Sequence, residues 1–109
     1  MAAQKHVSCK TPSHSAEAVW RQSPISRSAF LFFFHFVDYT HACSVDQDPR
    51  EFWPEVFRLL DLAATIPGLK LDSRIADLVD RLQPTVDAFD FMECAVVLSE
   101  WLMEHEGEV

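Results

Sequence analysis

Glycine is scarce in this chain of 109 residues, which contains only two. Tight hairpin turns and phosphate-binding loops both depend on glycine. The composition therefore argues against a fold rich in β-hairpins and against a glycine loop that cradles a phosphate. Hydrophobic residues make up 49% of the chain, which excludes a disordered acidic tail. The length fits one domain.

Cysteine pairs and long hydrophobic runs are also lacking. Cys9, Cys43 and Cys94 are odd in number and widely separated, unlike a disulfide framework. No secretory signal peptide is recognisable, so we expect a cytoplasmic protein. The most apolar run, residues 29–37, is nine residues long and contains a histidine. A membrane helix needs about twenty residues, so we expect no membrane partner.

Basic residues are few in the second part of the chain. Residues 1–42 hold four Lys or Arg against two Asp or Glu, whereas residues 43–109 hold five against fifteen. The net charges are therefore +2 and −10. An acidic surface repels nucleic-acid phosphates, so we expect no direct nucleic-acid partner. The acidity could serve solubility alone or could meet a basic patch on another protein.

Helix start and stop signals predict an all-α fold, a small bundle of four main helices and one short N-terminal helix. Residues 1–14 read as a flexible tail, and residues 15–109 as a single helical domain. Ser15 can cap a short helix that ends before Ser23. Ser23 followed by Pro24 then predicts an N-cap and first helical residue, with a helix to about Cys43.

The other helices are predicted from the same kinds of start and stop signal. They cover residues 49–66 (cap Asp48, stop Pro67-Gly68), 73–83 (cap Asp72, stop Pro84) and 86–105 (cap Thr85). Pro54 predicts a kink or a later start in the first of these. The last helix has two apolar faces, one with Phe89, Met92, Val96 and Met103 and one with Phe91, Cys94, Leu98, Trp101 and Leu102.

The predicted helix over residues 24–43 is the most unusual, because it holds five of the nine phenylalanines within residues 29–37. A helix that is apolar all round must be surrounded, either by its own domain or by a partner. Large aromatic side chains supply much of the energy at interfaces, so a homodimer, a complex with another protein, or both are expected. The candidate partner-binding residues are Phe30, Phe33, Phe34, Val37 and His41, for each of which core packing is the alternative.

Catalytic and metal-binding patterns are weak. The spacing of Asp38 and His41 occurs in di-iron bundles, but such sites need a second pair that this sequence lacks. A structural zinc site requires four ligands, usually in two closely spaced pairs, and the histidines and cysteines of this sequence do not provide them. Cys94, between apolar turns, reads as a small core residue. We therefore expect no enzyme, cofactor, metal or small-molecule substrate.

The aromatic-rich helix is followed by the segment DPREFWPEVFRLLDLAATIPG. In size, composition and helical layout the chain resembles the pseudomonad quorum-sensing anti-activators of the QslA type. That resemblance implies a small cytoplasmic homodimer that binds the ligand-binding domain of a LuxR-type transcriptional activator. Binding would disrupt the activator's dimer and so prevent it from binding promoter DNA. Two alternatives are an acidic, antitoxin-like inhibitor of a basic effector and a metal-binding protein that uses His35, Asp38 and His41.

Overall fold

The computed structural model describes residues 20, 21 and 23–108. Within these it contains four helices and two short 3-10 turns: α2 (Arg27–Val45), α3 (Pro49–Thr65), η3 (Leu69–Leu71), α4 (Ser73–Asp87), α5 (Phe91–Glu104) and η4 (Glu106–Glu108). No strand occurs in that part of the chain. The all-α bundle of four main helices is thus confirmed. The predicted tail and nearly all of the predicted short helix lie outside the described residues.

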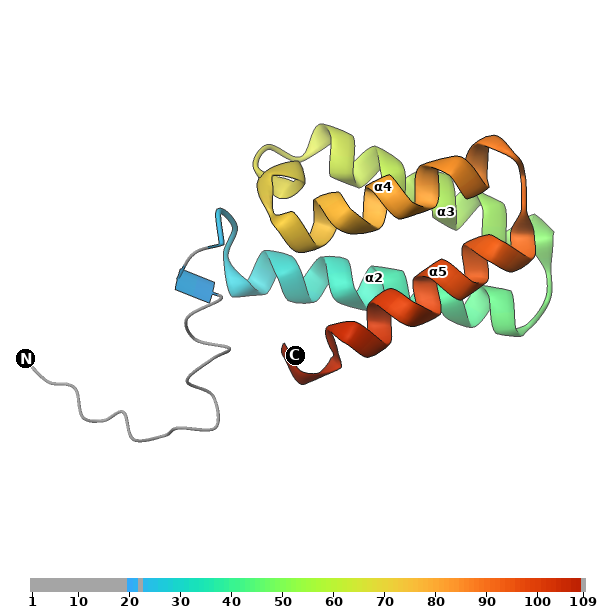
Figure 1. Cartoon of the computed structure of the whole chain (residues 1–109), viewed down its shortest axis with the longest axis horizontal. Helices are drawn as coiled ribbons and strands as arrows, with labels where there is room; N and C mark the ends of the chain where they lie inside the picture. The colour runs from blue at the N-terminus through green and yellow to red at the C-terminus, as the bar shows by residue number, and fades with distance from the viewer. Residues whose placement is uncertain (1–19, 22, 109) are drawn as a thin grey trace, which may run out of the picture.

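The helices form two layers around one core (Figure 1). Helix α2 packs against both α3 and α5. Helix α4 packs against α5, and the short turn η3 contacts both α3 and α4. Trp101 of α5 and Phe30 of α2 are completely buried where these layers meet, together with Phe52 of α3 and Ile75 of α4. Helix α2 is therefore covered by α3 and α5 on one side, whereas Phe32 and Tyr39, 55% and 59% exposed, remain open to solvent on the other.

Two of the predicted helix caps are confirmed. The side chain of Asp48 accepts a hydrogen bond from the backbone N–H of Arg50 at 3.1 Å. The side chain of Asp72 accepts one from the backbone N–H of Arg74 at 2.9 Å. Each cap satisfies one of the N–H groups that the first helical turn leaves without a partner. In α3 the helix starts at Pro49 and runs through Pro54.

The cap predicted at Ser23 is wrong. Ser26 caps α2 instead, accepting from the N–H of Ala29 at 3.2 Å, and the helix begins at Arg27. The hydroxyl of Ser23 donates to Oδ2 of Asp72 at 2.6 Å. The side chain of Ser23 therefore binds Asp72, which is distant in the sequence, instead of capping the helix as local sequence rules predict.

The boundary predicted at Pro84 is also wrong, because α4 continues through this proline to Asp87. The hydroxyl of Thr85 does not cap a new helix but donates back to the carbonyl of Leu82 at 2.7 Å. Leu82 and Val86 are both buried, and their burial favours the extra helical turn despite the hydrogen bond that proline removes. Asp90 caps α5, accepting from the N–H of Glu93 at 3.1 Å.

Candidate functional site: a groove between α2 and α5

The predicted partner-binding residues divide between the core and one groove. Phe30, Phe33 and Val37 are at most 1% exposed, so a partner cannot reach them in this fold. Their assignment to an interface is therefore corrected, and packing inside the monomer accounts for them. Phe34 and His41 project from the adjacent side of α2 and line a groove against α5. Phe34 and His41 are seven residues apart, about two helical turns, and lie at the edge of the face whose centre buries Phe30 and Val37.

The groove consists of two hollows that share His41 and Ser99, each with a volume of about 260 Å³. Phe34, Leu102 and Met103 line the first hollow. Val45, Met92 and Val96 line the second. We call this surface the α2–α5 groove.

Large apolar side chains are exposed along the α5 wall of the groove. Met92 and Met103 are each 70% exposed and Val96 is 44% exposed. With Ser99 they recur at intervals of four, three and four residues, which places them in one stripe. This stripe lies on the first of the two apolar faces predicted for the last helix, whereas the second face, with Cys94, Leu98 and Trp101, is in the core. The periodicity reveals both faces but does not tell which one is covered.

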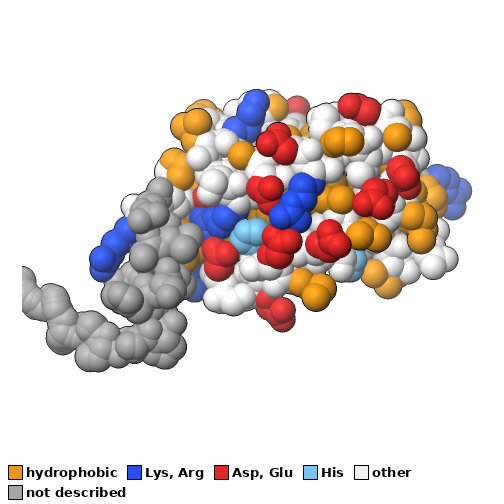
Figure 2. Space-filling view, in the orientation of Figure 1, with side chains coloured by type: hydrophobic (Ala, Val, Ile, Leu, Met, Phe, Trp, Pro, Cys, Tyr) orange, Lys and Arg blue, Asp and Glu red, His pale blue; other side chains and the backbone are white. Residues whose placement is uncertain are grey.

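Carboxylates border the groove. Asp38 and Glu106 line its first hollow. Glu93 and Glu100 lie beside Val96 on α5, three and four residues away, and are exposed. In the part of the chain that the structure describes, none of these four, which we call the acidic rim, forms an ion pair. Figure 2 shows acidic and hydrophobic side chains gathered over the α5 side of the molecule.

A second exposed apolar surface lies at the turn between α4 and α5. Phe89, which is 66% exposed, has its ring centroid 5.3 Å from that of Trp53 and 6.4 Å from that of Phe57. Phe57 is itself 44% exposed. We call these three residues the aromatic corner.

Phe89 also has an unusual backbone conformation. Its φ of 52° lies in the left-handed region. The N–H of Phe89 donates to the carbonyl of Val86 at 3.0 Å, and the N–H of Asp90 donates to that of Thr85 at 2.8 Å. These two bonds form a Schellman motif, whose left-handed position is usually occupied by glycine. A bulky aromatic residue in this conformation has a backbone cost that its contacts with Trp53 and Phe57 must offset.

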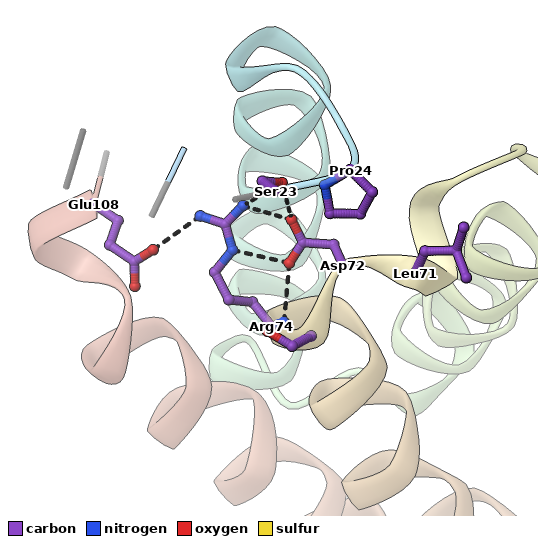
Figure 3. A pocket seen from close by; sticks show the side chains of 7 residues that line it. Ser23, Pro24, Leu71, Asp72, Arg74 and Glu108 are labelled. Carbon is purple, nitrogen blue, oxygen red and sulfur yellow. Dashed lines mark hydrogen bonds and ion pairs between the residues drawn. The ribbon is translucent and has the colours of Figure 1, made fainter. Parts of the chain in front are cut away.

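A buried cluster of polar residues joins the start and the end of the described chain (Figure 3). Arg74, only 8% exposed, donates through Nε to Asp72 at 2.9 Å and through Nη1 to Glu108 at 2.9 Å. Its Nη2 donates to the hydroxyl of Ser23 at 3.1 Å. The guanidinium carbon lies 4.4 Å from the ring centroid of Trp20. We call Ser23, Asp72, Arg74 and Glu108 the Arg74 cluster.

The Arg74 cluster is electrostatically satisfied, so we interpret it as a structural clamp. Burial alone would raise the pKa of Asp72, but hydrogen bonds from Arg74 and Ser23 outweigh it and lower that pKa. Burial likewise opposes the charge of Arg74, and the bonds to Asp72 and Glu108 outweigh it and raise the Arg74 pKa. A hollow of about 390 Å³ adjoins the cluster. Four of the five guanidinium N–H groups already donate to Asp72, Ser23 and Glu108, which leaves one N–H of Nη1 beside this hollow.

The other candidate chemical groups do not assemble into one site. His35 and Asp38 are exposed and His41 is half-buried along α2. No group of three or more His, Cys, Asp or Glu in the described part of the chain could hold a metal ion. Cys43 and Cys94 are buried free thiols, and burial raises the pKa of both, which disfavours the reactive thiolate. The burial of Cys94 agrees with its predicted place in the core.

Comparisons with known proteins give no indication of function, so the functional argument rests on the groove. No family model, curated protein or solved structure matches the chain. None of the described helices has the length and hydropathy needed to cross a membrane.

Proposed function

We propose that this protein acts by binding another protein in the α2–α5 groove rather than by catalysis. The observation that carries the proposal is the stripe of exposed Met92, Val96 and Met103 beside two apolar hollows. Contiguous exposed apolar surface with a polar border is typical of protein interaction sites. Phe34 and His41 form the opposite wall, and they are the two predicted contact residues that a partner can reach.

For the partner we propose the ligand-binding domain of a LuxR-type transcriptional activator in the cytoplasm, following the resemblance to QslA-type anti-activators. Such activators bind DNA as dimers, so a protein that covers the apolar dimer surface prevents DNA binding without touching DNA. The negative charge of the chain, −8 in total, is compatible with this indirect mode, because an acidic protein does not compete for phosphates.

A gel-shift titration tests this function. A LuxR-type activator from the same cell, bound to its promoter DNA, is titrated with the purified protein. We expect the DNA to be released, and analytical ultracentrifugation should show the activator's dimer replaced by a mixed complex. DNA binding and activator dimerisation that persist at saturating protein would contradict the proposal.

The main alternative is an acidic inhibitor that neutralises a basic effector through charge. Reversing the charge of Glu100 and Glu104 to lysine would abolish that function but would only weaken binding driven by apolar contact. The complementary substitution must lie in the groove, where Met103→Ser removes an exposed side chain. Phe33→Glu cannot serve, because Phe33 is 1% exposed and a buried glutamate would unfold the domain.

We also propose that the protein forms a homodimer, and that the aromatic corner makes the contact. Two copies facing each other through the groove would bring their acidic rims together, which disfavours that arrangement. Phe57 and Phe89 carry no charge and expose aromatic rings, the side chains that contribute most at interfaces. Sedimentation equilibrium tests this, with Phe89→Ser expected to shift the protein to a monomer. Leu71→Ser, on η3, removes an apolar side chain that is even more exposed and is expected not to.

A further inference from the structure

We infer that the occupant of the α2–α5 groove is an amphipathic α-helix with lysine or arginine beside its apolar face. The inference rests on the proposed function, since it assumes that the groove binds a protein. It adds the shape and charge of the partner segment, which the resemblance does not supply.

The shape of the groove favours a helix. Its walls are two helices, and the exposed stripe on α5 runs from Met92 to Met103. Eleven residues at about 1.5 Å each give a length of roughly 16 Å, which is about three turns of a partner helix. A helix laid in such a groove inserts side chains spaced by three and four residues, which matches hollows that follow one another along α5.

The chemistry of the walls favours an apolar face on that helix. Two of the most exposed wall residues, Met92 and Met103, are methionines. Methionine side chains are flexible and polarisable, so they adapt to leucine-like or aromatic side chains of different shape. The groove should therefore bind a partner helix that has an apolar stripe and should accept different apolar residues in that stripe.

The border of the groove favours positive charge on the flanks. Asp38 lies on the α2 side, Glu93 and Glu100 on the α5 side and Glu106 at one end. Among described residues no lysine or arginine lines either hollow. Glu104, next along the same face of α5, differs because Arg81 already binds it at 2.8 Å. Lysine or arginine flanking the apolar stripe of the partner would meet the acidic rim on both sides.

Fluorescence anisotropy with synthetic peptides tests the inference on the full chain. The probe is a labelled helix of leucine and lysine, about four turns long, with all leucines on one face. One control peptide has the same composition in an order that gives no apolar face. The other has glutamate in place of lysine. We expect the probe to bind at least about tenfold more tightly than either control at physiological salt.

Protein variants locate the binding site. Met92→Ser together with Met103→Ser should weaken binding of the probe by about tenfold or more, because apolar contact is lost from both hollows. Glu93→Gln with Glu100→Gln should weaken binding and reduce its dependence on salt. Leu71→Ser removes an exposed apolar side chain outside the groove and should leave affinity unchanged.

Three results would overturn the inference: equal binding of the two lysine peptides, equal binding of the glutamate peptide, or unchanged affinity of the double serine variant. The first would show that the apolar face is not recognised, the second that the charge is not, and the third that the probe binds elsewhere. Failure here and failure of the proposed function are distinguishable. If the activator domain binds through the groove while the probe does not, only the helix chemistry is wrong; if the probe binds through the groove while no activator does, only the proposed partner is wrong.

Discussion

Replacing Phe89 by glycine and by alanine isolates the cost of its left-handed backbone. Both substitutions remove the ring, so they lose the same contacts with Trp53 and Phe57. Phe89 is 66% exposed. Only about a third of its roughly 200 Å² is therefore buried, which corresponds to about 1.7 kcal/mol at 25 cal/mol per Å².

The two variants differ in the backbone term. Alanine keeps the strain of the left-handed conformation, which costs about 1 kcal/mol or somewhat more, whereas glycine relieves it. We therefore expect Phe89→Ala to unfold about 1.7 kcal/mol more easily than the native protein, and Phe89→Gly to lie within about 1 kcal/mol of it. At ordinary helical positions the order is reversed, because glycine is less stable than alanine by about 1 kcal/mol.

Urea unfolding followed by circular dichroism measures these free energies. It should be carried out at a protein concentration at which every variant is monomeric, so that a change in dimerisation does not enter. Ala42→Gly, on the exposed side of α2, is the matched control and should destabilise the protein. If Phe89→Gly is less stable than Phe89→Ala, the argument from backbone strain is refuted.

Three further predictions concern the core. Asp72→Asn should lower the free energy of unfolding by about 3 kcal/mol in urea titrations, because it removes one of the two carboxylates that pair with the buried guanidinium of Arg74. Since the folded-state pKa of Asp72 is lowered from 3.8, its stabilising effect is present above about pH 4 and is lost as the pH falls through the folded value, so unfolding curves of the native protein should show more loss on acidification than those of Asp72→Asn. Trp101→Phe should cost about 1–3 kcal/mol in the same assay, because its indole N–H donates to a buried carbonyl at 2.9 Å. In a Cys9→Ser variant, Cys43 and Cys94 should resist a thiol reagent until urea unfolds the chain; rapid labelling of the folded protein would contradict their burial.

Helix caps were predictable where the stabilising contact is local. Asp48 and Asp72 each bond an N–H two residues onward, an interaction that residue type and spacing reveal. Ser23 was not predictable in this way, because its partner lies 49 residues away. The helix end predicted at Pro84 was wrong for a related reason. The burial of Leu82 and Val86 outweighs the local preference against proline inside a helix, and burial depends on the whole fold.

The candidate site was predictable in part. The sequence identifies α2 as the unusual helix and α5 as having two apolar faces, but periodicity does not say which face a neighbour covers. Phe30 and Phe34 show the difference: one is completely buried and the other lines the groove. Only the packing of α5 on α2 decides between them.

The most direct test of the central claim compares two proteins by isothermal titration calorimetry against the ligand-binding domain of a LuxR-type activator. One is the native chain, and the other carries Met92→Ser and Met103→Ser in the α2–α5 groove. We predict that the native chain binds and that the double variant binds about thirtyfold more weakly, from roughly 1 kcal/mol lost at each methionine. Equal affinities of the two proteins would contradict the claim that the groove is the binding site.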